Sequence, residues 1–342
     1  MTHENVTQAN VTQTIMEQEA KQAPKVVENQ LKANQVLVNV IGENLRKLDP
    51  KMVMIIGRGS SDHAGVFGKY LIEIEAGVPT FAAAPSVSSV YGKQLKLKQA
   101  LVIVISQSGR SPDIIAQAKM AKAAGAYCVA LVNDETSPLA DIVDDVLPLK
   151  AGAEISVAAT KSYLATLSAL LQLTAYWTEN DELIAALASL PAAMQAMIDT
   201  SAQLTPESIA GVKNMVVLGR GLGYAITKEM ALKLKEVCSI HAESFSSAEF
   251  LHGPVTLVEQ GLAILNCQVD DESAIAHGEQ ISEMLARGAD VVTLKQLDTE
   301  MHPRLAPLVV LQRFYLDVAH VAVSRGFNPD EPKGLKKVTR TV

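Results

Sequence analysis

Three ionisable residues at helical spacing are the first feature of the sequence that could carry out chemistry. Glu229, Lys233 and Glu236 stand at positions i, i+4 and i+7, which places them along one narrow face of a helix. Two carboxylates beside an ammonium can accept and return protons. The same spacing also occurs in solvated salt-bridge ladders, so the trio alone leaves both interpretations open.

The surroundings of this trio favour a functional site. An apolar stripe on the same helix leaves the charged face well defined; it comprises Ile226, Met230, Leu234 and Val237. The segment that follows adds four titratable groups, which are His241, Glu243, Glu249 and His252. So many ionisable side chains close together indicate proton transfer.

A second candidate site lies at residues 106–111, where an apolar segment ends in Ser-Gln-Ser-Gly-Arg-Ser. Pro112 then favours the first turn of a helix. Hydroxyl groups, backbone N–H groups and the positive end of a helix dipole can bind one anion there. An ordinary serine N-cap explains one of the three serines but not the others. We therefore predict a phosphate-binding loop, with the turn at residues 57–61 as its second wall.

These two sites need a framework, and the sequence predicts one. Continuously apolar runs at residues 52–56, 80–84, 100–105, 127–132 and 146–149 alternate with helical patterns, which is typical of a parallel sheet covered on both faces. The segment at residues 53–59 recurs at residues 215–221, with later apolar runs at 262–267 and 291–294. The predicted fold class is α/β, with two tandem doubly wound, flavodoxin-like parallel-sheet domains.

The pattern also predicts the organisation of the chain. Helical periodicity at residues 14–48 predicts N-terminal helices, with Pro24 in the first turn of the second one. The predicted segments are a flexible leader at 1–13, these helices at 14–48, a first domain at 49–175, a helical linker at 176–210, a second domain at 211–325 and a C-terminal active-site tail at 326–342.

Composition excludes several classes of protein. The net charge of -7 over 342 residues argues against nucleic-acid binding, which needs a positive surface. The longest apolar runs are too short to span a membrane, and no signal-like segment opens the sequence. The three cysteines, Cys128, Cys238 and Cys267, are widely spaced in apolar segments and are predicted to be buried, reduced thiols. We expect a cytoplasmic protein.

Several motifs together resemble one known family. They are Ser106–Ser111, Val157-Ala-Ala-Thr-Lys161, Ala231–Glu236, His241-Ala-Glu243, His252-Gly-Pro254 and the tail at residues 330–337. From about residue 30 onward the chain resembles the sugar isomerase (SIS) family, most closely the paired SIS domains that form the isomerase half of glucosamine-6-phosphate synthase.

The resemblance implies roles for individual residues. Glu236 is expected to move a proton between C1 and C2, His252 to help open the sugar ring from the neighbouring subunit of a homodimer, and Lys337 to engage the carbonyl carbon. Glu229 and Lys233 match polar residues around the base. The expected phosphate-binding residues are Ser106, Gln107, Ser108, Ser111 and Ser61, and the expected sugar-binding residues are Gly59, Ser60, Val157 and Lys336.

Two substitutions and one absence separate this chain from those relatives. Ser111 replaces a threonine and keeps its hydroxyl, whereas Ala159 replaces a serine and removes one possible sugar contact. No cysteine precedes Cys128, so we expect no glutamine-hydrolysing domain. The chain therefore resembles the stand-alone type II glucosamine-6-phosphate deaminases.

The expected activity is the conversion of glucosamine 6-phosphate and water into fructose 6-phosphate and ammonia. A carboxylate can perform both proton transfers, and the reaction requires no metal or organic cofactor. The glycines at 219, 221 and 223 lack the spacing of a dinucleotide fingerprint. Alternative hypotheses are a fructosamine-6-phosphate deglycase, another hexosamine-phosphate isomerase, or a non-catalytic sugar-phosphate-binding regulator.

Overall fold

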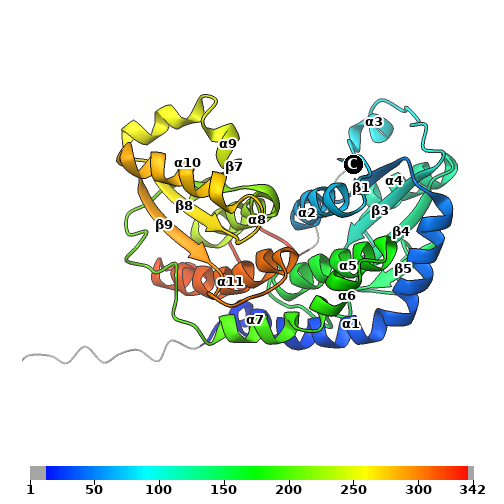
Figure 1. Cartoon of the computed structure of the whole chain (residues 1–342), viewed down its shortest axis with the longest axis horizontal. Helices are drawn as coiled ribbons and strands as arrows, with labels where there is room; N and C mark the ends of the chain where they lie inside the picture. Colours follow the sequence, from blue (N-terminus) through cyan, green and yellow to red (C-terminus); the bar gives the residue numbers. More distant parts are fainter. Residues whose placement is uncertain (1–12, 338–342) are drawn as a thin grey trace, which may run out of the picture.

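The computed structural model describes residues 13–337, which form two lobes above a common base of long helices (Figure 1). Each lobe contains one parallel sheet. The predicted leader therefore lies outside the described residues except for Gln13, and the predicted tail is described as far as Lys337.

The first lobe is built on five parallel strands in the order β2-β1-β3-β4-β5. All residues of β3 are buried, as expected for a central strand with helices on both faces. The chain order reverses between β1 and β3, which is where ligands bind in flavodoxin-like sheets. The strands are β1 (Met52–Ile56), β2 (Thr80–Ala82), β3 (Ala100–Ser106), β4 (Tyr127–Val132) and β5 (Asp145–Pro148), and the helices are α2 (Ser60–Glu75), α3 (Ser86–Ser89) and α4 (Pro112–Ala123).

The second lobe repeats this arrangement with four parallel strands in the order β7-β6-β8-β9. The predicted fold class, two tandem doubly wound α/β domains, is thus confirmed. The strands are β6 (Asn214–Gly219), β7 (His241–Ser246), β8 (Ala263–Gln268) and β9 (Asp290–Lys295). The helices are α8 (Gly221–Cys238), α9 (Ser247–Phe250), the 3-10 helix η1 (Pro254–Gln260) and α10 (Ala274–Ala286).

Strand β7 was not predicted, because it is polar. It is the edge strand of its sheet and pairs only with β6 among the described strands. Its exposed residues include His241 and Glu243, so it lacks the continuous apolar run of a central strand. Two of the four titratable groups that follow α8 therefore lie on this strand.

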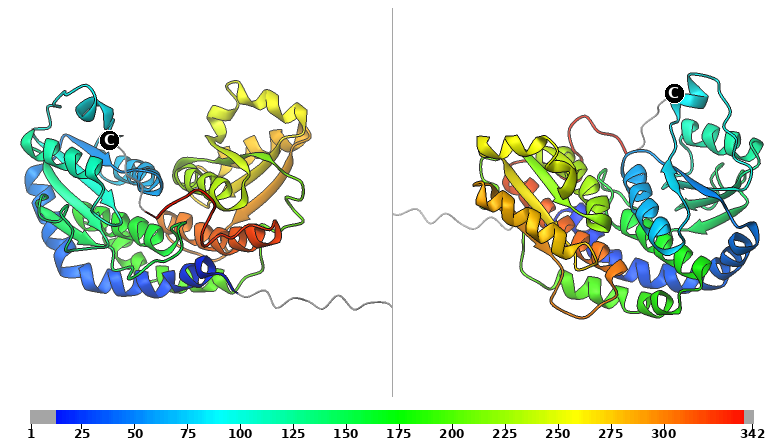
Figure 2. Two further views of the ribbon diagram at one scale, coloured as in Figure 1. Left: turned by 180° about the vertical axis from the view of Figure 1, so that it is seen from behind. Right: turned by 45° about the horizontal axis from the view of Figure 1, so that its top comes forward.

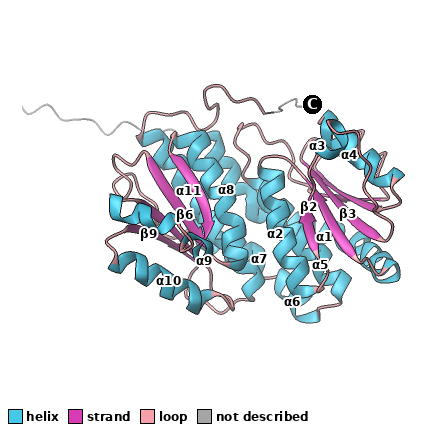
Figure 3. Ribbon diagram, turned by 90° about the horizontal axis from the view of Figure 1, so that it is seen from above, coloured by secondary structure: helices cyan, strands magenta, loops and turns pink. Residues whose placement is uncertain are grey.

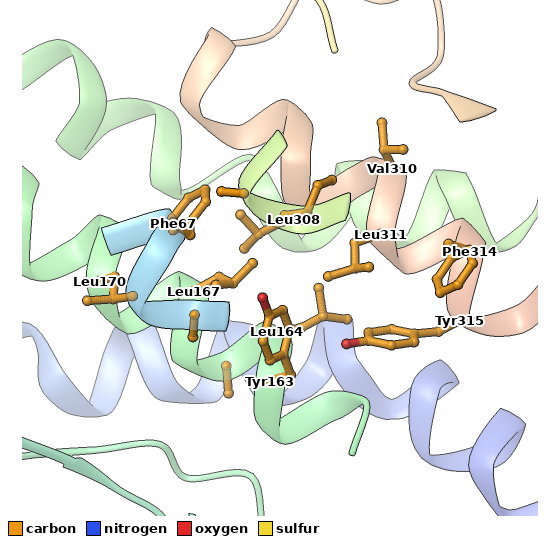
Figure 4. Packing of buried hydrophobic residues seen from close by; sticks show 14 of the residues in the cluster. Phe67, Tyr163, Leu164, Leu167, Leu170, Leu308, Val310, Leu311, Phe314 and Tyr315 are labelled. Carbon is orange, nitrogen blue, oxygen red and sulfur yellow. The ribbon is translucent and has the colours of Figure 1, made fainter. Parts of the chain in front are cut away.

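Helices from both halves of the chain, long and short, form the base. They are α1 (Ile15–Leu48), α5 (Lys161–Thr178), α6 (Asp181–Leu187), α7 (Leu190–Ile198), η2 (Pro303–Leu305) and α11 (Ala306–Ser324). Helix α1 packs against α5, α7 and α11. Figure 4 shows the core that results, in which Phe67 of α2, Leu167 of α5 and Leu308 of α11 are buried together.

Helix α11 is as apolar as a membrane-spanning helix but is part of this core. With η2 it forms the segment Pro303–Ser324, the one unbroken helix among the described residues that is long and apolar enough to cross a bilayer. Of its apolar window, 89% is buried inside the protein. The apolar composition of α11 is therefore explained by its burial in the helical base of the molecule.

The N-terminal helices predicted at residues 14–48 are in fact one helix, and Pro24 lies in its interior. A proline there removes one hydrogen bond, which leaves the carbonyl of Ala20 without its usual donor. The side-chain amide of Gln312 on α11 donates to that carbonyl at 3.0 Å. Tertiary contact thus compensates for the proline, and the prediction of a break was wrong.

The two lobes meet along α2 and α8, which lie side by side between the sheets (Figure 3). Tyr70 of α2 and Tyr224 of α8 form an edge-to-face pair at 6.3 Å between ring centroids. The segment after α11 crosses from the second lobe toward the first (Figure 2). The helix interface and this tail bring residues from both halves to one place.

Candidate active site

The acid–base trio lies on α8, on the face that meets the first lobe. The ammonium of Lys233 is 3.1 Å from Glu229 Oε1 and 2.6 Å from Glu236 Oε2. The side chains of Glu229 and Lys233 are 0% and 1% exposed, whereas that of Glu236 is 21% exposed. The trio is therefore not a solvated ladder: Glu236 is the most exposed of the three, and Lys233 orients its carboxylate.

Glu229 links α8 to both other parts of the protein. It accepts a hydrogen bond from Ser60 Oγ at 3.0 Å, lies 3.2 Å from His63 Nδ1, and accepts from the Tyr315 hydroxyl at 3.4 Å. Burial opposes its charge, but Lys233 and His63 outweigh burial, so the pKa of Glu229 is lowered. Burial likewise opposes the charge of Lys233, yet both glutamates raise its pKa. The pair is thus ionised and fixed.

The predicted phosphate loop follows β3 and is held in shape from within. Ser106 Oγ accepts from the N–H of Gly109 at 3.1 Å, and Ser108 Oγ accepts from the N–H of Arg110 at 3.3 Å. Gly109 has φ +62°, which favours glycine. Ser111 is the N-cap residue of α4, but within the described chain its hydroxyl makes no capping bond. That hydroxyl is available to a ligand.

The turn after β1 faces this loop across the switch point. A Cβ on Gly57 would approach the carbonyl carbon of Ser61 to 2.6 Å, so only glycine allows the turn to close this tightly. Gly59 has φ +54° and precedes α2, which begins with Ser60 and Ser61. The turn therefore brings Ser61 to the crevice between β1 and β3, while the Ser60 hydroxyl is bonded to Glu229 on α8.

The C-terminal tail brings Lys337 to the same region. Its ammonium donates to Glu154 Oε2 at 3.2 Å and to the carbonyl of Ser156 at 2.5 Å. The buried Glu154 carboxylate also accepts from Thr160 N–H at 3.0 Å and from Ser162 Oγ at 2.6 Å. Glu154 is thus a rigid anchor for the tail lysine.

A second anchor holds the tail farther back. The carboxylate of Asp330 accepts from the N–H groups of Ile15 and Met16, at 2.9 and 2.7 Å, at the start of α1. The Asp330 carbonyl accepts from Val157 N–H at 2.9 Å. The start of α1, the loop before α5 and the tail therefore meet at one residue.

These elements enclose a cavity of about 220 Å³ between the lobes. Its lining contains eight of the predicted site residues, namely Ser60, Ser61, Gln107, Val157, Lys233, Glu236, Lys336 and Lys337. Four others complete the lining: Arg58, Glu154, Ala159 and Leu335. Groups suited to bind an anion and groups suited to move a proton thus share one cavity.

The other predicted residues do not line this cavity in the described part of the chain. Gly59, Ser106, Ser108 and Ser111 belong to the turn and loop that border it, and Glu229 lies behind Lys233. His252 is exposed after α9 on the second lobe. Its expected contribution across a subunit interface stays a prediction.

Sequence reasoning did not assign site roles to His63, Glu154 or Tyr315, and it included Arg58 only as part of the turn at residues 57–61. His63 follows the glycine turn by one helical turn, and its position on α2 could have suggested a contact with α8. Glu154 and Tyr315 gave no local signal, because each reaches the site through long-range packing.

The corresponding edge of the second sheet is filled by side chains. The ring of His277 lies between Ser247 Oγ at 2.9 Å and Asn266 Oδ1 at 2.7 Å. Arg220, which follows β6, donates to Gln280 Oε1 at 3.4 Å. Burial, together with the charge of Arg220, lowers the pKa of His277 to about 4. The two domains therefore share a topology but carry different side chains at the carboxyl ends of their strands.

Fold and cavity together define an α/β protein with two parallel-sheet domains and one polar cavity between them, and comparison with known proteins identifies the family. The model of the SIS domain matches residues 48–176 and 208–304. The chain belongs to the SIS domain family, with one SIS domain in each lobe. Its relatives place it in the phosphosugar isomerase superfamily.

Three relatives illustrate the similarity. A glutamine–fructose-6-phosphate aminotransferase (isomerizing) of Bacillus subtilis is 34% identical over 304 residues, which cover 83% of this chain and 50% of that protein. The chain thus spans about half the length of the curated relatives it matches. A structure from Silicibacter pomeroyi, provisionally named a phosphosugar isomerase, is 38% identical, with TM-score 0.86, and covers 93% of this chain and 100% of that one. A glucosamine-6-phosphate deaminase from Thermotoga maritima has TM-score 0.75 and 21% identity, covers 96% of this chain and 100% of that one, and shows a shared fold.

Proposed function

We propose that this protein is an isomerising deaminase that converts glucosamine 6-phosphate and water into fructose 6-phosphate and ammonia. The observation that carries the proposal is the shared cavity, in which Ser61 and Gln107 face Lys233, Glu236 and Lys337. A phosphate held at the switch point leaves the far end of a hexose chain beside the α8 carboxylate.

The proposed chemistry uses one carboxylate twice. Glu236 removes the proton from C2 of the open-chain amino aldehyde and returns it to C1. The aldehyde oxygen gains a proton and the amino nitrogen loses one, so the product is a C1 alcohol with an imine at C2. Water adds to that imine, and ammonia leaves as the ketone forms. Lys337 engages the carbonyl end of the chain, and Glu154 holds its ammonium in place.

The cysteines take no part in the proposed chemistry. All three are free and buried, as the sequence predicts. Burial raises the pKa of Cys128 and of Cys238 to about 12 and raises that of Cys267 further. Thiolates are the reactive form of cysteine, so none of the three residues is an activated nucleophile.

Assembly and location belong to the same proposal. His252 is exposed and lies away from the cavity of its own chain, which leaves it available to a neighbouring subunit. We propose a cytoplasmic homodimer in which His252 assists ring opening in its partner. Analytical ultracentrifugation tests the dimer. Mixing a His252→Gln variant with a Glu236→Gln variant tests whether His252 acts in the partner subunit. Recovery of activity in the mixed dimers is expected.

A substrate panel tests the activity. Purified protein is incubated with glucosamine 6-phosphate, N-acetylglucosamine 6-phosphate, fructosamine 6-phosphate and glucosamine, and released ammonia and fructose 6-phosphate are measured. Equal amounts of both products from glucosamine 6-phosphate are expected. Ammonia from fructosamine 6-phosphate alone would instead indicate a deglycase. Binding without turnover of any substrate would indicate a regulator.

A further inference from the structure

Arg58 occupies a position that the proposed reaction has not yet used. It lies in the turn between β1 and α2 and lines the cavity together with Ser61 and Gln107. Its side chain is 49% exposed, yet its Nε donates to Asp113 Oδ2 at 2.9 Å. An arginine that is fixed at one end and open at the other is well suited to meet a ligand.

Asp113 is the reason that Arg58 points across the switch point. It is in the first turn of α4, directly after the phosphate loop, and its side chain is only 4% exposed. The bond therefore joins the turn after β1 to the helix after β3. This bond uses Nε of Arg58. The two terminal nitrogens of the guanidinium can still donate hydrogen bonds to a ligand.

Charge provides the second argument. The side chains offered by the loop at residues 106–111 to the cavity edge are neutral hydroxyl and amide groups, while Arg110 turns away to Asp134 at 2.7 Å. Lys233 is paired with two glutamates, and Lys337 with Glu154. Lys336 also lines the cavity, but it belongs to the exposed tail and not to a strand end. The protein as a whole carries a net charge of -7, so a dianionic ligand needs a local cation.

We propose that Arg58 is the cationic phosphate-binding residue of this site and that Asp113 positions it. The guanidinium donates to phosphate oxygens that the serines and the N–H groups of the loop hold from the other side. This inference rests on the proposed function in that the ligand is a sugar phosphate. It adds a residue that discriminates phosphorylated sugars from free sugars.

Calorimetric titration with inorganic phosphate and with fructose 6-phosphate tests the role of Arg58 without requiring turnover. Arg58→Gln is expected to weaken both ligands about 10- to 100-fold, the usual effect of losing a charge-assisted hydrogen bond. Asp113→Asn is expected to weaken them less, because the guanidinium stays but loses its anchor. In steady-state kinetics, Arg58→Gln is expected to raise KM and to keep kcat within about threefold of the wild-type value.

Lys122→Gln is the matched control, because it removes one positive charge from the same domain at a residue of α4 that pairs with Asp144 and does not line the cavity. It is expected to change both affinities by less than about threefold. Equal losses in Arg58→Gln and Lys122→Gln would mean a general field effect and would overturn the proposal, as would unchanged binding in Arg58→Gln. This test can be separated from the test of the deaminase activity. If the protein releases no ammonia, the proposed reaction is wrong, but the phosphate titrations still decide the role of Arg58.

Discussion

The ammonium of Lys337 lies 3.2 Å from the carboxylate of Glu154, although 183 residues separate them in the chain. The lysine belongs to the tail after the second domain, and the glutamate belongs to the loop that precedes α5 in the first. The carboxylate is buried and receives three further hydrogen bonds from Thr160 and Ser162. The surrounding hydrogen bonds, and not only the opposite charges, therefore fix this pair in place.

Glu154→Gln is expected to slow ammonia release because it leaves Lys337 without its anionic partner. We expect kcat to fall about 10- to 100-fold, in line with the loss of one well-placed polar contact, with little change in the affinity for inorganic phosphate. Glu135→Gln, which removes a carboxylate from an exposed pair with Lys150, is the control. Equal kcat values in the two variants would contradict a positioning role.

Glu236→Gln is expected to abolish most of the proton transfer while sparing ligand binding. General-base catalysis contributes about 10²- to 10⁴-fold, so the rate of ammonia release should fall by that factor. Fructose 6-phosphate should still bind in calorimetry. Glu283→Gln, on the exposed face of α10, should behave as wild type, and turnover of Glu236→Gln at the wild-type rate would remove Glu236 from the mechanism.

Gly109→Ala is expected to weaken phosphate binding by distorting the loop after β3. A methyl group there would meet the side chain of Ser137, and φ +62° is unfavourable for alanine. We expect a loss of at least about tenfold in phosphate affinity, since the loop must shift by more than a rotamer change.

Gly125→Ala separates backbone strain from site geometry. Gly125 also has positive φ, +85°, but an added Cβ has only Lys98 Cα near it, at 4.0 Å. This variant should lose stability without losing phosphate affinity. If both alanine variants bind phosphate as wild type does, then the loop geometry does not contribute to the site.

His277 predicts a pH dependence of stability in the second domain. Its pKa falls from 6.5 to about 4 in the folded state, so the folded protein resists protonation that the unfolded chain accepts. Its contribution is therefore fully present above pH 6.5 and is lost as pH falls toward 4. The free energy of unfolding is measured by urea titration at pH 7.5 and at pH 5. Between these two pH values it should decrease more in wild type than in His277→Gln. An equal decrease in both proteins would contradict a role for His277.

Local signals made the first half of the site predictable. Strand β1 runs directly into the glycine turn, and strand β3 runs directly into the loop at residues 106–111, so apolar runs with their end residues identify both. The same holds for the trio on α8, whose spacing is short. A parallel sheet also places successive strand ends at one edge, so the meeting of Ser61 with Gln107 follows from topology.

The remaining contacts depend on packing that no local pattern encodes. Tyr315 reaches Glu229 because α11 fills the base between the lobes, and Glu154 meets Lys337 because the tail folds back. The break predicted at Pro24 failed for the same reason, since Gln312 supplies the missing donor from a distant helix. Strand β7 was missed because an edge strand tolerates polar residues.

Asp330 connects the beginning of α1 with the mouth of the cavity through a single side chain and its own carbonyl. Glu19, one turn into α1, accepts from the N–H of Ser156 at 3.1 Å and thereby braces the same loop. Loss of either brace would loosen Val157 and the tail while the core of α1 stays packed. A deep mutational scan scored for turnover should therefore find sensitive positions at the start of a helix that never touches the substrate.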